Sequence, residues 1–528
     1  MGATTTLNGT LQPLLESHPG LNGVYLLSDP LDAFATRIQL IEAAEQSVDL
    51  QYYIWANDTT GRHMLDAVQR AAKRGVRVRL LLDDFGCLGA DELFSALDLH
   101  PLIDIRLFNP LISRRLKWTG YITNFSRIHR RMHNKAFTVD QQVTIVGGRN
   151  IGDVYFDGAG ENSFVDLDVL ALGPVAQEVS EDFERYWESA ASYPAADFFP
   201  AVDGERQQQL LAELGQHDGD GAERYRQAIR ESRLLADILT GRAQLTWAPV
   251  IMVSDDPAKV IEKCSKGDML SQQLAVALGQ PRHRVTLVSP YLIPMKGGVA
   301  LFRGLVDRGV TVSLLTNSLA ASDVPLVHIA YSKYRKALAR AGVELFEMRA
   351  TGKAPGATGD SGPGAPPPKR SRDNVFEGKG AEKGADRRGQ GSTKGVRKRK
   401  SGLMGSKSHG GKAGIMGSKS SSLHAKTFAV DSQKLFVGSL NFDPRSTRLN
   451  TELGFIIESP ELAMQLEAYF DTVAAKTCYQ LSLTRRGDLC WHEQNDGDTI
   501  RHTCEPQTTF CTRILNRCCS LLPVDSFL

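Results

Sequence analysis

The hydrophobic and polar positions of this chain predict alternating strands and helices from about residue 47. Polar and apolar side chains alternate over residues 47–54, which is typical of a strand, and residues 76–82 predict a second, buried strand. Between them, Leu65, Val68 and Ala72 fall on one face of a helix over residues 62–74, which Gly75 ends. Strand, helix and strand in this order predict a βαβ unit.

The same order of elements returns in the second half of the chain. Residues 284–289 predict a strand, a helix runs through Val299, Leu305 and Val306, and another strand follows over 308–315. The letters Lys-Arg-Gly-Val from Lys73 match Asp-Arg-Gly-Val from Asp307. Each half then has one more short strand, at 103–108 and at 343–346. The chain therefore contains an internal duplication.

A length of 528 residues exceeds one ordinary hydrophobic core. We expect an α/β protein with one domain at 1–245, a second at 246–480 and a C-terminal tail at 481–528. In the tail, Phe510, Ile514, Cys518 and Leu521 share one helical face, with Arg513 and Arg517 nearby. This pattern fits a helix on a membrane surface or a helix docked on the core, and periodicity does not choose between them.

Charge is distributed unevenly along the chain. The formal net charge is +2, but residues 351–420 hold 16 Lys or Arg against 5 Asp or Glu, so they carry +11 and leave −9 on the rest. The segment is rich in Gly, Pro and Ser and buries too little apolar surface to order by itself. We expect a disordered basic insertion at about 350–422 within the second domain.

We expect neither secretion nor a membrane-spanning segment from this sequence. Residues 1–30 have no basic stretch followed by an apolar run, and no apolar run of about 18 residues occurs anywhere. Six of the eight cysteines lie in the last 51 residues without C-x-x-C spacing. These observations indicate a reducing compartment and no structural zinc site.

Two copies of the motif H-x-K-x4-D are the strongest functional signal. In both copies the aspartate follows the histidine by seven residues and an asparagine follows it by seventeen. A further acid comes later in each half, eight residues before a proline. The first copy provides His133, Lys135, Asp140, Asn150 and Asp166, and the second provides His424, Lys426, Asp431, Asn441 and Glu452.

These residue types match the needs of substitution at a phosphodiester. Side chains two apart on a strand point to the same face, so the histidine and lysine of each copy converge on one pocket. One histidine can attack phosphorus, while the other protonates the departing alkoxide and later deprotonates the acceptor. Lys135, Lys426, Asn150 and Asn441 would hold the phosphoryl oxygens.

The motif aspartates complete the candidate catalytic set, but their position favours another role. Seven extended residues at ~3.3 Å each would place Asp140 roughly 20 Å from His133. Asp140 and Asp431 fall at hairpin turns, where a short carboxylate commonly binds local backbone, so we interpret both as architectural. Asp166 and Glu452 are the better candidates for orienting the imidazoles.

A single histidine in a strand is commonly a structural residue, and the matched pair argues against that reading. Clustered histidines can also bind zinc. Here, however, they come with lysines, which would repel a cation, and without cysteine partners. We therefore expect neither a metal nor another cofactor.

The chain resembles the phospholipase D superfamily in its two motifs and in the segments Gly147–Asn150 and Gly438–Asn441. In each member of that superfamily, two such halves form one active site. The stretches Gln51–Trp55, Leu315–Ala321 and Asn441–Ser446 look like bacterial cardiolipin synthases of the C type. The basic insertion and the cysteine-rich tail depart from that pattern.

The resemblance implies transfer of a phosphatidyl group between phospholipids through a phosphohistidine, with phosphatidylglycerol as acceptor. The sequence leaves the donor open: the lipid partners would be phosphatidylglycerol and, as an alternative donor, phosphatidylethanolamine, at the anionic cytoplasmic face of the bacterial inner membrane, where the enzyme would be peripheral. In the superfamily the first histidine usually attacks, which implies His133, and the second acts as acid and base, which implies His424.

Two rival functions remain open from the sequence. The first is a hydrolase or nuclease that acts on phosphodiesters, guided by the basic insertion, although we do not expect nucleic acid as a partner. The second is a membrane-binding protein with a vestigial site. Intact His, Lys and Asn in both halves argue against loss of the site.

Overall fold

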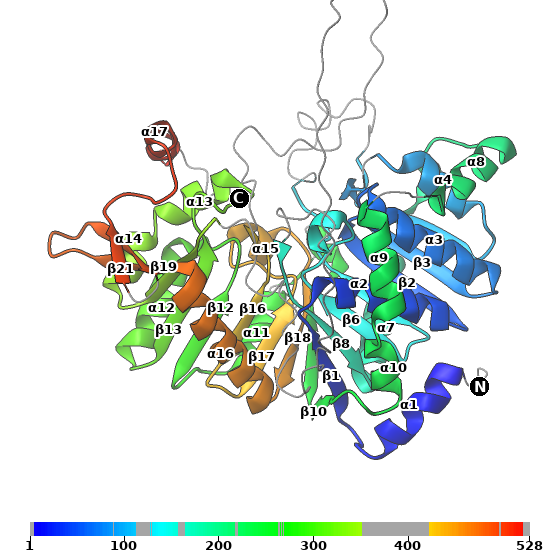
Figure 1. The fold of residues 1–528 in the computed structure, drawn as a ribbon, viewed down its shortest axis with the longest axis horizontal. Helices are drawn as coiled ribbons and strands as arrows, with labels where there is room; N and C mark the ends of the chain where they lie inside the picture. Colours follow the sequence, from blue (N-terminus) through cyan, green and yellow to red (C-terminus); the bar gives the residue numbers. More distant parts are fainter. Residues whose placement is uncertain are drawn as a thin grey trace, which may run out of the picture. The chain divides into compact units, whose positions relative to one another are not determined.

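The structure, a computed structural model, describes residues 5–520 apart from 88, 112–126, 128, 157–163, 217–219, 262–263, 266, 268, 351–421 and 496–497 (Figure 1). Almost all of the basic insertion expected at 350–422 therefore lies outside the described residues. The description that follows concerns the body of the chain, which forms one compact unit without residues 358–412.

The first half of the chain forms a nine-stranded mixed sheet. Its order is β10-β1-β8-β6-β5-β2-β3-β4-β9, and β2, β3 and β4 run parallel to one another. The strands are β1 (Asn22–Leu27), β2 (Ser47–Ile54), β3 (Arg77–Gly86), β4 (Ile103–Phe108), β5 (Ala136–Val139), β6 (Val143–Gly147), β8 (Asp168–Leu172), β9 (Ser192–Pro194) and β10 (Thr246–Ala248).

The second half forms a ten-stranded mixed sheet. Its order is β11-β18-β17-β16-β12-β13-β14-β19-β20-β21, with β12, β13 and β14 parallel. The strands are β11 (Val250–Ser254), β12 (Arg284–Val288), β13 (Thr311–Asn317), β14 (Glu344–Met348), β16 (Thr427–Val430), β17 (Lys434–Gly438), β18 (Leu453–Glu458), β19 (Cys478–Leu483), β20 (Leu489–Asn495) and β21 (Asp498–His502).

The two sheets repeat one topology. The order β1-β8-β6-β5-β2-β3-β4-β9 of the first sheet corresponds strand by strand to β11-β18-β17-β16-β12-β13-β14-β19 of the second. Both predicted motif hairpins are present, as β5–β6 and as β16–β17. The expected α/β duplication is therefore confirmed at the level of sheet order.

Helices cover both sheets, and several begin where the sequence provides a cap. Asp29 caps α2 and Ser459 caps α16, each followed by a proline at the first helical position. The described α-helices are α1 (Thr6–Glu16), α2 (Pro30–Ala43), α3 (Thr59–Lys73), α4 (Asp91–Asp98), α7 (Pro174–Trp187), α8 (Gly204–Leu214), α9 (Asp220–Glu231), α10 (Leu234–Leu239), α11 (Leu270–Leu278), α12 (Met295–Asp307), α13 (Pro325–Ser332), α14 (Arg335–Arg340), α15 (Pro444–Arg448), α16 (Pro460–Thr477) and α17 (Phe510–Cys519).

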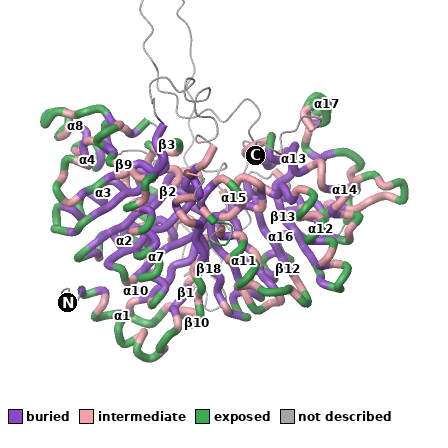
Figure 2. The backbone as a smooth tube through the Cα atoms, turned by 180° about the vertical axis from the view of Figure 1, so that it is seen from behind, coloured by how far each residue is buried: buried purple, intermediate pink, exposed green. Residues whose placement is uncertain are grey.

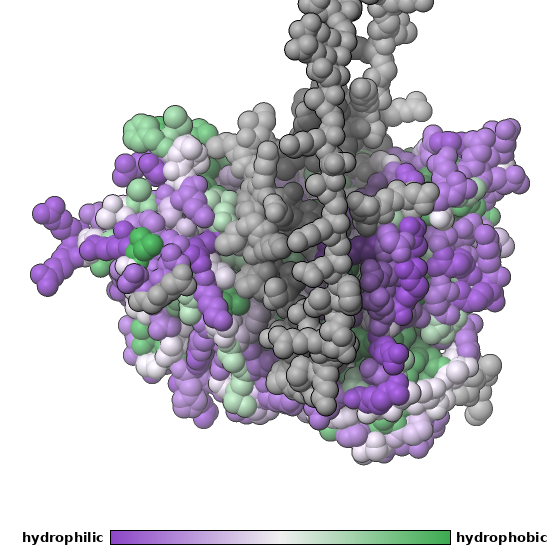
Figure 3. All heavy atoms as spheres, viewed as in Figure 1, coloured by the Kyte–Doolittle hydropathy of each residue, from purple (hydrophilic) through white to green (hydrophobic). Residues whose placement is uncertain are grey.

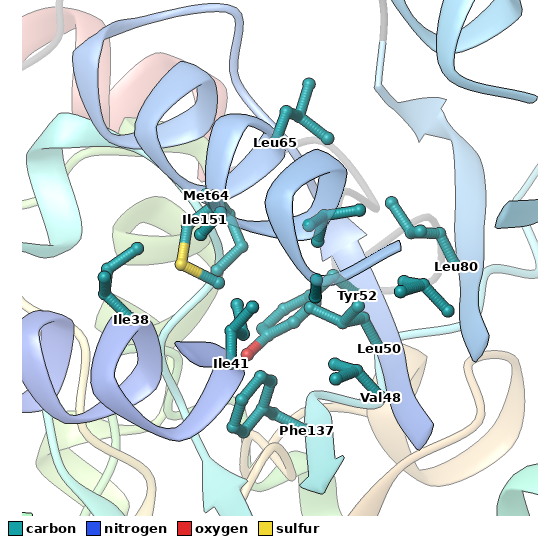
Figure 4. Close-up of a cluster of buried hydrophobic side chains, with 14 of the residues drawn as sticks. Ile38, Ile41, Val48, Leu50, Tyr52, Met64, Leu65, Leu80, Phe137 and Ile151 are labelled. Carbon is teal, nitrogen blue, oxygen red and sulfur yellow. The ribbon is translucent and has the colours of Figure 1, made fainter. Parts of the chain in front are cut away.

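The largest core lies between the first sheet and its helices (Figures 2 and 4). Alternation along β2 turns Val48, Leu50 and Tyr52 toward this core, where Ile38 of α2 and Met64 of α3 meet them. Each fully buried aliphatic side chain stabilises the fold by about 1.5–3 kcal/mol relative to leaving it exposed. The central strands are therefore held firmly on one side.

The opposite faces of the two sheets pack against each other. Val146 and Val169 of the first sheet share a buried cluster with Val437, Leu453 and Phe455 of the second. Strands β6 and β17 belong to the motif hairpins, and β8 and β18 pair with them. This apolar contact brings the two histidine motifs to one place.

The second sheet continues past residue 480, where the sequence analysis placed the start of a tail. Strand β19 spans that boundary, and β20 and β21 extend the sheet to His502. The tail boundary was placed too early because Leu481, Cys490 and Trp491 are buried against the second domain. Among the described helices, none is both long and apolar enough to cross a membrane.

Candidate active site

Each motif histidine contacts an acid from the other half of the chain. The Nδ1–H of His133 donates to Glu452 Oε2 at 2.8 Å, and the Nδ1–H of His424 donates to Asp166 Oδ2 at 2.5 Å. His133 and His424 are both buried, with 8% and 7% of their surfaces exposed. With Nδ1 occupied in this way, Nε2 of each ring is the nitrogen for attack or proton transfer, and Lys426 Nζ lies 3.3 Å from that of His424.

Backbone hydrogen bonds make this crossing reciprocal. The His133 amide donates to Thr451 O at 2.9 Å, one residue before Glu452, and the His424 amide donates to Val165 O at 2.8 Å, one residue before Asp166. The short strands β7 (Phe164–Val165) and β15 (Ser422–Leu423) pair in parallel beside this contact. Each half therefore positions the histidine of the other.

The two motif lysines lie beside their histidines, as strand alternation predicts. Lys135 Nζ donates to His133 O at 2.6 Å, and Lys426 Nζ donates to His424 O. Lys135 also lies over the ring of Tyr53, with Nζ 5.4 Å from the ring centre. Both lysines are 2% exposed, so their amino groups are largely shielded from bulk water. Such cations can hold the non-bridging oxygens of a phosphodiester.

The two motif asparagines differ in their contacts. Asn150 accepts from the Ile54 amide at 3.1 Å and donates to Tyr155 Oη at 2.9 Å, so it joins the end of β2 to a ring that packs edge-on against His424. Asn441 Oδ1 is buried and has no hydrogen-bond partner among the described residues. The expectation that both amides hold phosphoryl oxygens alike overlooked the packing role of Asn150.

The motif aspartates lie away from the histidines, at the hairpin turns. Asp140 accepts from the amides of Glu45, Gln46 and Ser47 at 2.8–3.0 Å. Asp431 likewise accepts from three consecutive amides, those of residues 282–284. Both have a positive φ, as the first residue of a tight two-residue turn requires. These contacts agree with the architectural interpretation of both aspartates.

The two acids are held in different ways. Gly148 and Ser439 stand at matching positions in the two halves. A Cβ at Gly148 would lie 2.1 Å from Asp166 Oδ1, so the shorter carboxylate occupies that space. In the other half Ser439 Oγ donates to Glu452 Oε2 at 2.5 Å. The glycine at 148 therefore makes room for an acid that approaches the backbone closely.

Sequence reasoning missed a buried pair that positions Glu452. Asp255 Oδ2 accepts from the Glu452 amide at 3.0 Å and from Lys259 Nζ at 2.9 Å. Lys259 Nζ also donates to Ser446 O at 3.1 Å. No spacing in the sequence indicates this pair, because the contact to Glu452 spans 197 residues.

Burial and charge set the ionisation of the site. Burial lowers the pKa of His424 to about 4 and that of Lys135 to about 7. Burial also raises the pKa of Glu452 to about 7, although Lys135 opposes this. For Asp166 burial acts upward as well, but His424 and Lys426 outweigh it and hold the pKa of that carboxyl well below its usual range. The two imidazole–carboxylate pairs therefore differ electrostatically.

Comparison with known proteins identifies the family. A family model described as "Cardiolipin synthase, PLD-like domain" matches residues 37–187 and 388–474. Cardiolipin synthase C of Escherichia coli (strain K12) is 41% identical over 98% of this chain and 99% of its own length. The chain belongs to the cardiolipin synthase family of phospholipase D-like proteins. The predicted family and enzyme class are thereby confirmed.

The chain is also similar to more distant proteins. An uncharacterized protein of Helicobacter pylori (strain ATCC 700392 / 26695) is 28% identical and covers 98% of this chain and 92% of that protein. The crystal structure of phosphatidylserine synthase from Haemophilus influenzae Rd KW20 covers 98% of this chain and 99% of that chain, with a TM-score of 0.55 and 13% identity. That likeness shows the same fold.

We expect a pH profile with two limbs for this family member. Burial holds the pKa of His133 well below its usual range, and as pH falls far enough for this nucleophile to gain a proton, activity falls. As pH rises through about 7, Lys135 loses its charge and activity falls again. The measurement is kcat/KM against pH with short-chain phosphatidylglycerol below its micelle concentration, since this ratio reports ionisations of the free enzyme.

Glu452 titrates in the same range as Lys135, so a variant must separate them. Arginine stays protonated at every accessible pH, so K135R should move the alkaline limb upward if Lys135 sets it. Deprotonation of Glu452 supplies charge and should raise activity, so an alkaline limb that stays in place in K135R would show that Lys135 does not set it.

Proposed function

We propose that this protein is a cardiolipin synthase that transfers a phosphatidyl group to the hydroxyl of phosphatidylglycerol through a phosphohistidine. The observation that carries the proposal is the crossed pair of imidazole–carboxylate hydrogen bonds, His133 with Glu452 and His424 with Asp166. This arrangement supplies one nucleophile and one acid/base on opposite sides of a single phosphorus. The name of the Escherichia coli relative supports the lipid substrate.

In the first half-reaction, His133 Nε2 attacks the phosphorus of the donor phospholipid. The N–P bond forms as the bond from phosphorus to the headgroup oxygen breaks, and His424 gives that oxygen a proton. The anionic phosphodiester between the rings raises the pKa of His424 and so supplies the acid. Glycerol leaves when phosphatidylglycerol is the donor, and ethanolamine leaves when phosphatidylethanolamine is the donor.

In the second half-reaction, the acceptor hydroxyl loses its proton to His424 Nε2 and its oxygen attacks phosphorus. The N–P bond breaks and cardiolipin leaves with the site restored. Lys135 and Lys426 neutralise the non-bridging oxygens in both steps, and Asp166 and Glu452 stabilise the positive charge that develops on each ring. The roles of His133 and His424 follow the superfamily pattern.

The proposed substrates are membrane lipids, so we place the enzyme at the anionic cytoplasmic face of the bacterial inner membrane, as a peripheral protein. Phosphatidylglycerol supplies the negative surface charge that such a protein meets there. We also propose that residues 1–245 and 246–480 are the two catalytic halves, with β10 (Thr246–Ala248) completing the first sheet and β19–β21 extending the second.

The test incubates purified full-length protein in EDTA with phosphatidylglycerol vesicles, alone and mixed with phosphatidylethanolamine, and resolves the lipid products. Cardiolipin formation in both mixtures is expected, and EDTA tests the predicted independence from metal. Phosphatidic acid as the only product would make the protein a hydrolase.

No lipid turnover in any mixture would overturn the proposal. The same protein and a variant lacking residues 351–420 would then be tested for salt-dependent binding and cleavage of single-stranded DNA.

If the wild type does transfer lipid, equal lipid transfer by the deletion variant would show that the basic insertion is dispensable for chemistry.

A further inference from the structure

Helix α17 presents its apolar side away from the protein. At 3.6 residues per turn, one face carries Phe510, Ile514 and Cys518 together with Cys511 and Leu515. Phe510 is 68% exposed, Ile514 47% and Leu515 42%, and both cysteines lie on the surface or near it. In Figure 3, hydrophobic side chains gather over this helix at the upper left.

The polar side of α17 faces the protein. Asn516 is the buried residue of the helix, and its Nδ2 donates to Glu505 Oε2 at 3.2 Å. A helix docked on a core buries its apolar face, which is the reverse of this arrangement. The docked-helix interpretation of the tail is therefore excluded for the described part of the tail.

A buried ion pair anchors this inverted helix. Glu505 Oε1 accepts from Arg335 Nη2 at 2.5 Å and lies 3.4 Å from His328 Nε2. Burial raises the pKa of Glu505, but His328 and Arg335 outweigh it and bring the pKa to about 2. The anchor is thus charged and stable throughout the neutral range.

The anchor leads back to the active site through hydrogen bonds. His328 Nδ1 lies 3.2 Å from Asn317 O, and the Asn317 side chain both donates to and accepts from the Leu423 backbone at 2.9 Å. Leu423 immediately precedes His424. Helix α17 therefore stands at the same end of the second sheet as the catalytic histidine, the end where β13 stops.

The positive charge of the helix indicates that its binding partner is anionic. Between Glu505 and Ser520 the chain has no Asp or Glu, while Arg513 and Arg517 flank the apolar face. An apolar face bordered by cations fits a bilayer that contains anionic phospholipid, with the apolar side chains in the acyl boundary and the guanidinium groups at the phosphates.

We propose that α17 is an interfacial anchor that inserts Phe510, Ile514 and Leu515 into an anionic bilayer and holds the end of the second sheet that carries His424 close to the lipid. The inference rests on the proposed function, because a lipid substrate has to be drawn from a membrane surface. It adds to that function the helix that binds the membrane surface.

The test compares full-length wild type with a variant that carries F510S, I514S and L515S. A matched control carries L99S, V276S and L301S, three apolar residues that are at least 56% exposed, at the end of α4, on α11 and on α12. Binding is measured by sedimentation with vesicles of equal parts phosphatidylglycerol and phosphatidylethanolamine, and with phosphatidylcholine vesicles. We expect at least about tenfold weaker binding to the anionic vesicles for the α17 variant only.

Activity on two forms of substrate separates docking from chemistry. The α17 variant should lose turnover on vesicles in proportion to binding, while its turnover of short-chain phosphatidylglycerol below the micelle concentration should equal wild type. The wild type could also bind vesicles but turn over no lipid. If the α17 variant then lost vesicle binding, the anchor would be supported and the proposed synthase activity refuted. Unchanged vesicle binding by the α17 variant would overturn the anchor.

The other possible occupant of this face is a second copy of the chain. Sedimentation velocity of the same proteins without lipid measures this directly. A wild-type dimer that the α17 substitutions convert to monomer, with vesicle binding unchanged, would overturn the membrane assignment in favour of self-association. In F510W, a blue-shifted emission that brominated lipid quenches would place this position in the acyl region and support the anchor.

Discussion

Replacing His133 or His424 by alanine should lower cardiolipin formation at least about 10³-fold, the largest effect expected in this protein. H133A removes the nucleophile, and H424A removes the group that protonates the departing oxygen. Their effects should not add in the double variant, because both residues serve one phosphorus. The measurement is initial-rate conversion of short-chain phosphatidylglycerol, which is independent of membrane docking.

A control histidine and a trapping experiment make this result specific. His492 on β20 binds Ser482 and lies in the extension of the second sheet, so H492A should keep wild-type turnover. With donor labelled at phosphorus, H133N should give no labelled enzyme, whereas H424N should accumulate label when the donor has a leaving group that needs no proton. Label on H133N but not on H424N would exchange the two roles.

Changing Asp166 or Glu452 should have the second largest effect. D166N and E452Q keep the shape of the side chain but remove the charge that stabilises each imidazolium, so we expect turnover to fall by about 10²–10⁴-fold. Because the pairs are crossed, D166N acts through His424 and E452Q acts through His133. Steady-state kinetics measures the loss.

Nitrogen-15 NMR of labelled histidine tests the crossing itself. D166N should shift the Nδ1 resonance of His424 and leave that of His133 nearly unchanged, and E452Q should do the opposite. Shifts confined to the histidine of the same half would contradict the crossed arrangement.

Asp140 provides the matched control for these acids. D140N weakens the three backbone hydrogen bonds at the first hairpin turn, so it should lower the free energy of unfolding by about 1–3 kcal/mol while turnover of the folded enzyme persists. If D140N lost activity at unchanged stability while D166N and E452Q stayed active, the roles assigned to these carboxylates would be reversed.

Local pattern was sufficient for the elements and for the chemistry of the motifs. Alternation along residues 47–54 predicts β2, and helical spacing with Gly75 as its end predicts α3. The spacing of His133 and Lys135, repeated at His424 and Lys426, predicts two histidines and two lysines for one phosphodiester. These inferences hold because strand and helix geometry relates residues that are close in sequence.

Packing over long distances decided the rest. The sequence indicates Asp166 and Glu452 as partners of the histidines but cannot assign them, since the two contacts span 258 and 319 residues. The same holds for Asp255, which bonds the Glu452 amide across 197 residues.

The tail shows the same division. Its apolar periodicity by itself fits both a core helix and a surface helix, because a hydrophobic face can turn either way. The bonds of Glu505 to Arg335 and Asn516 decide the direction by holding the polar face inward. The sequence by itself therefore determined the duplicated elements and the reactive groups. Only the tertiary structure decided which half provides the acid for which histidine and which face the last helix turns away from the protein. Both depend on contacts between residues far apart in the chain.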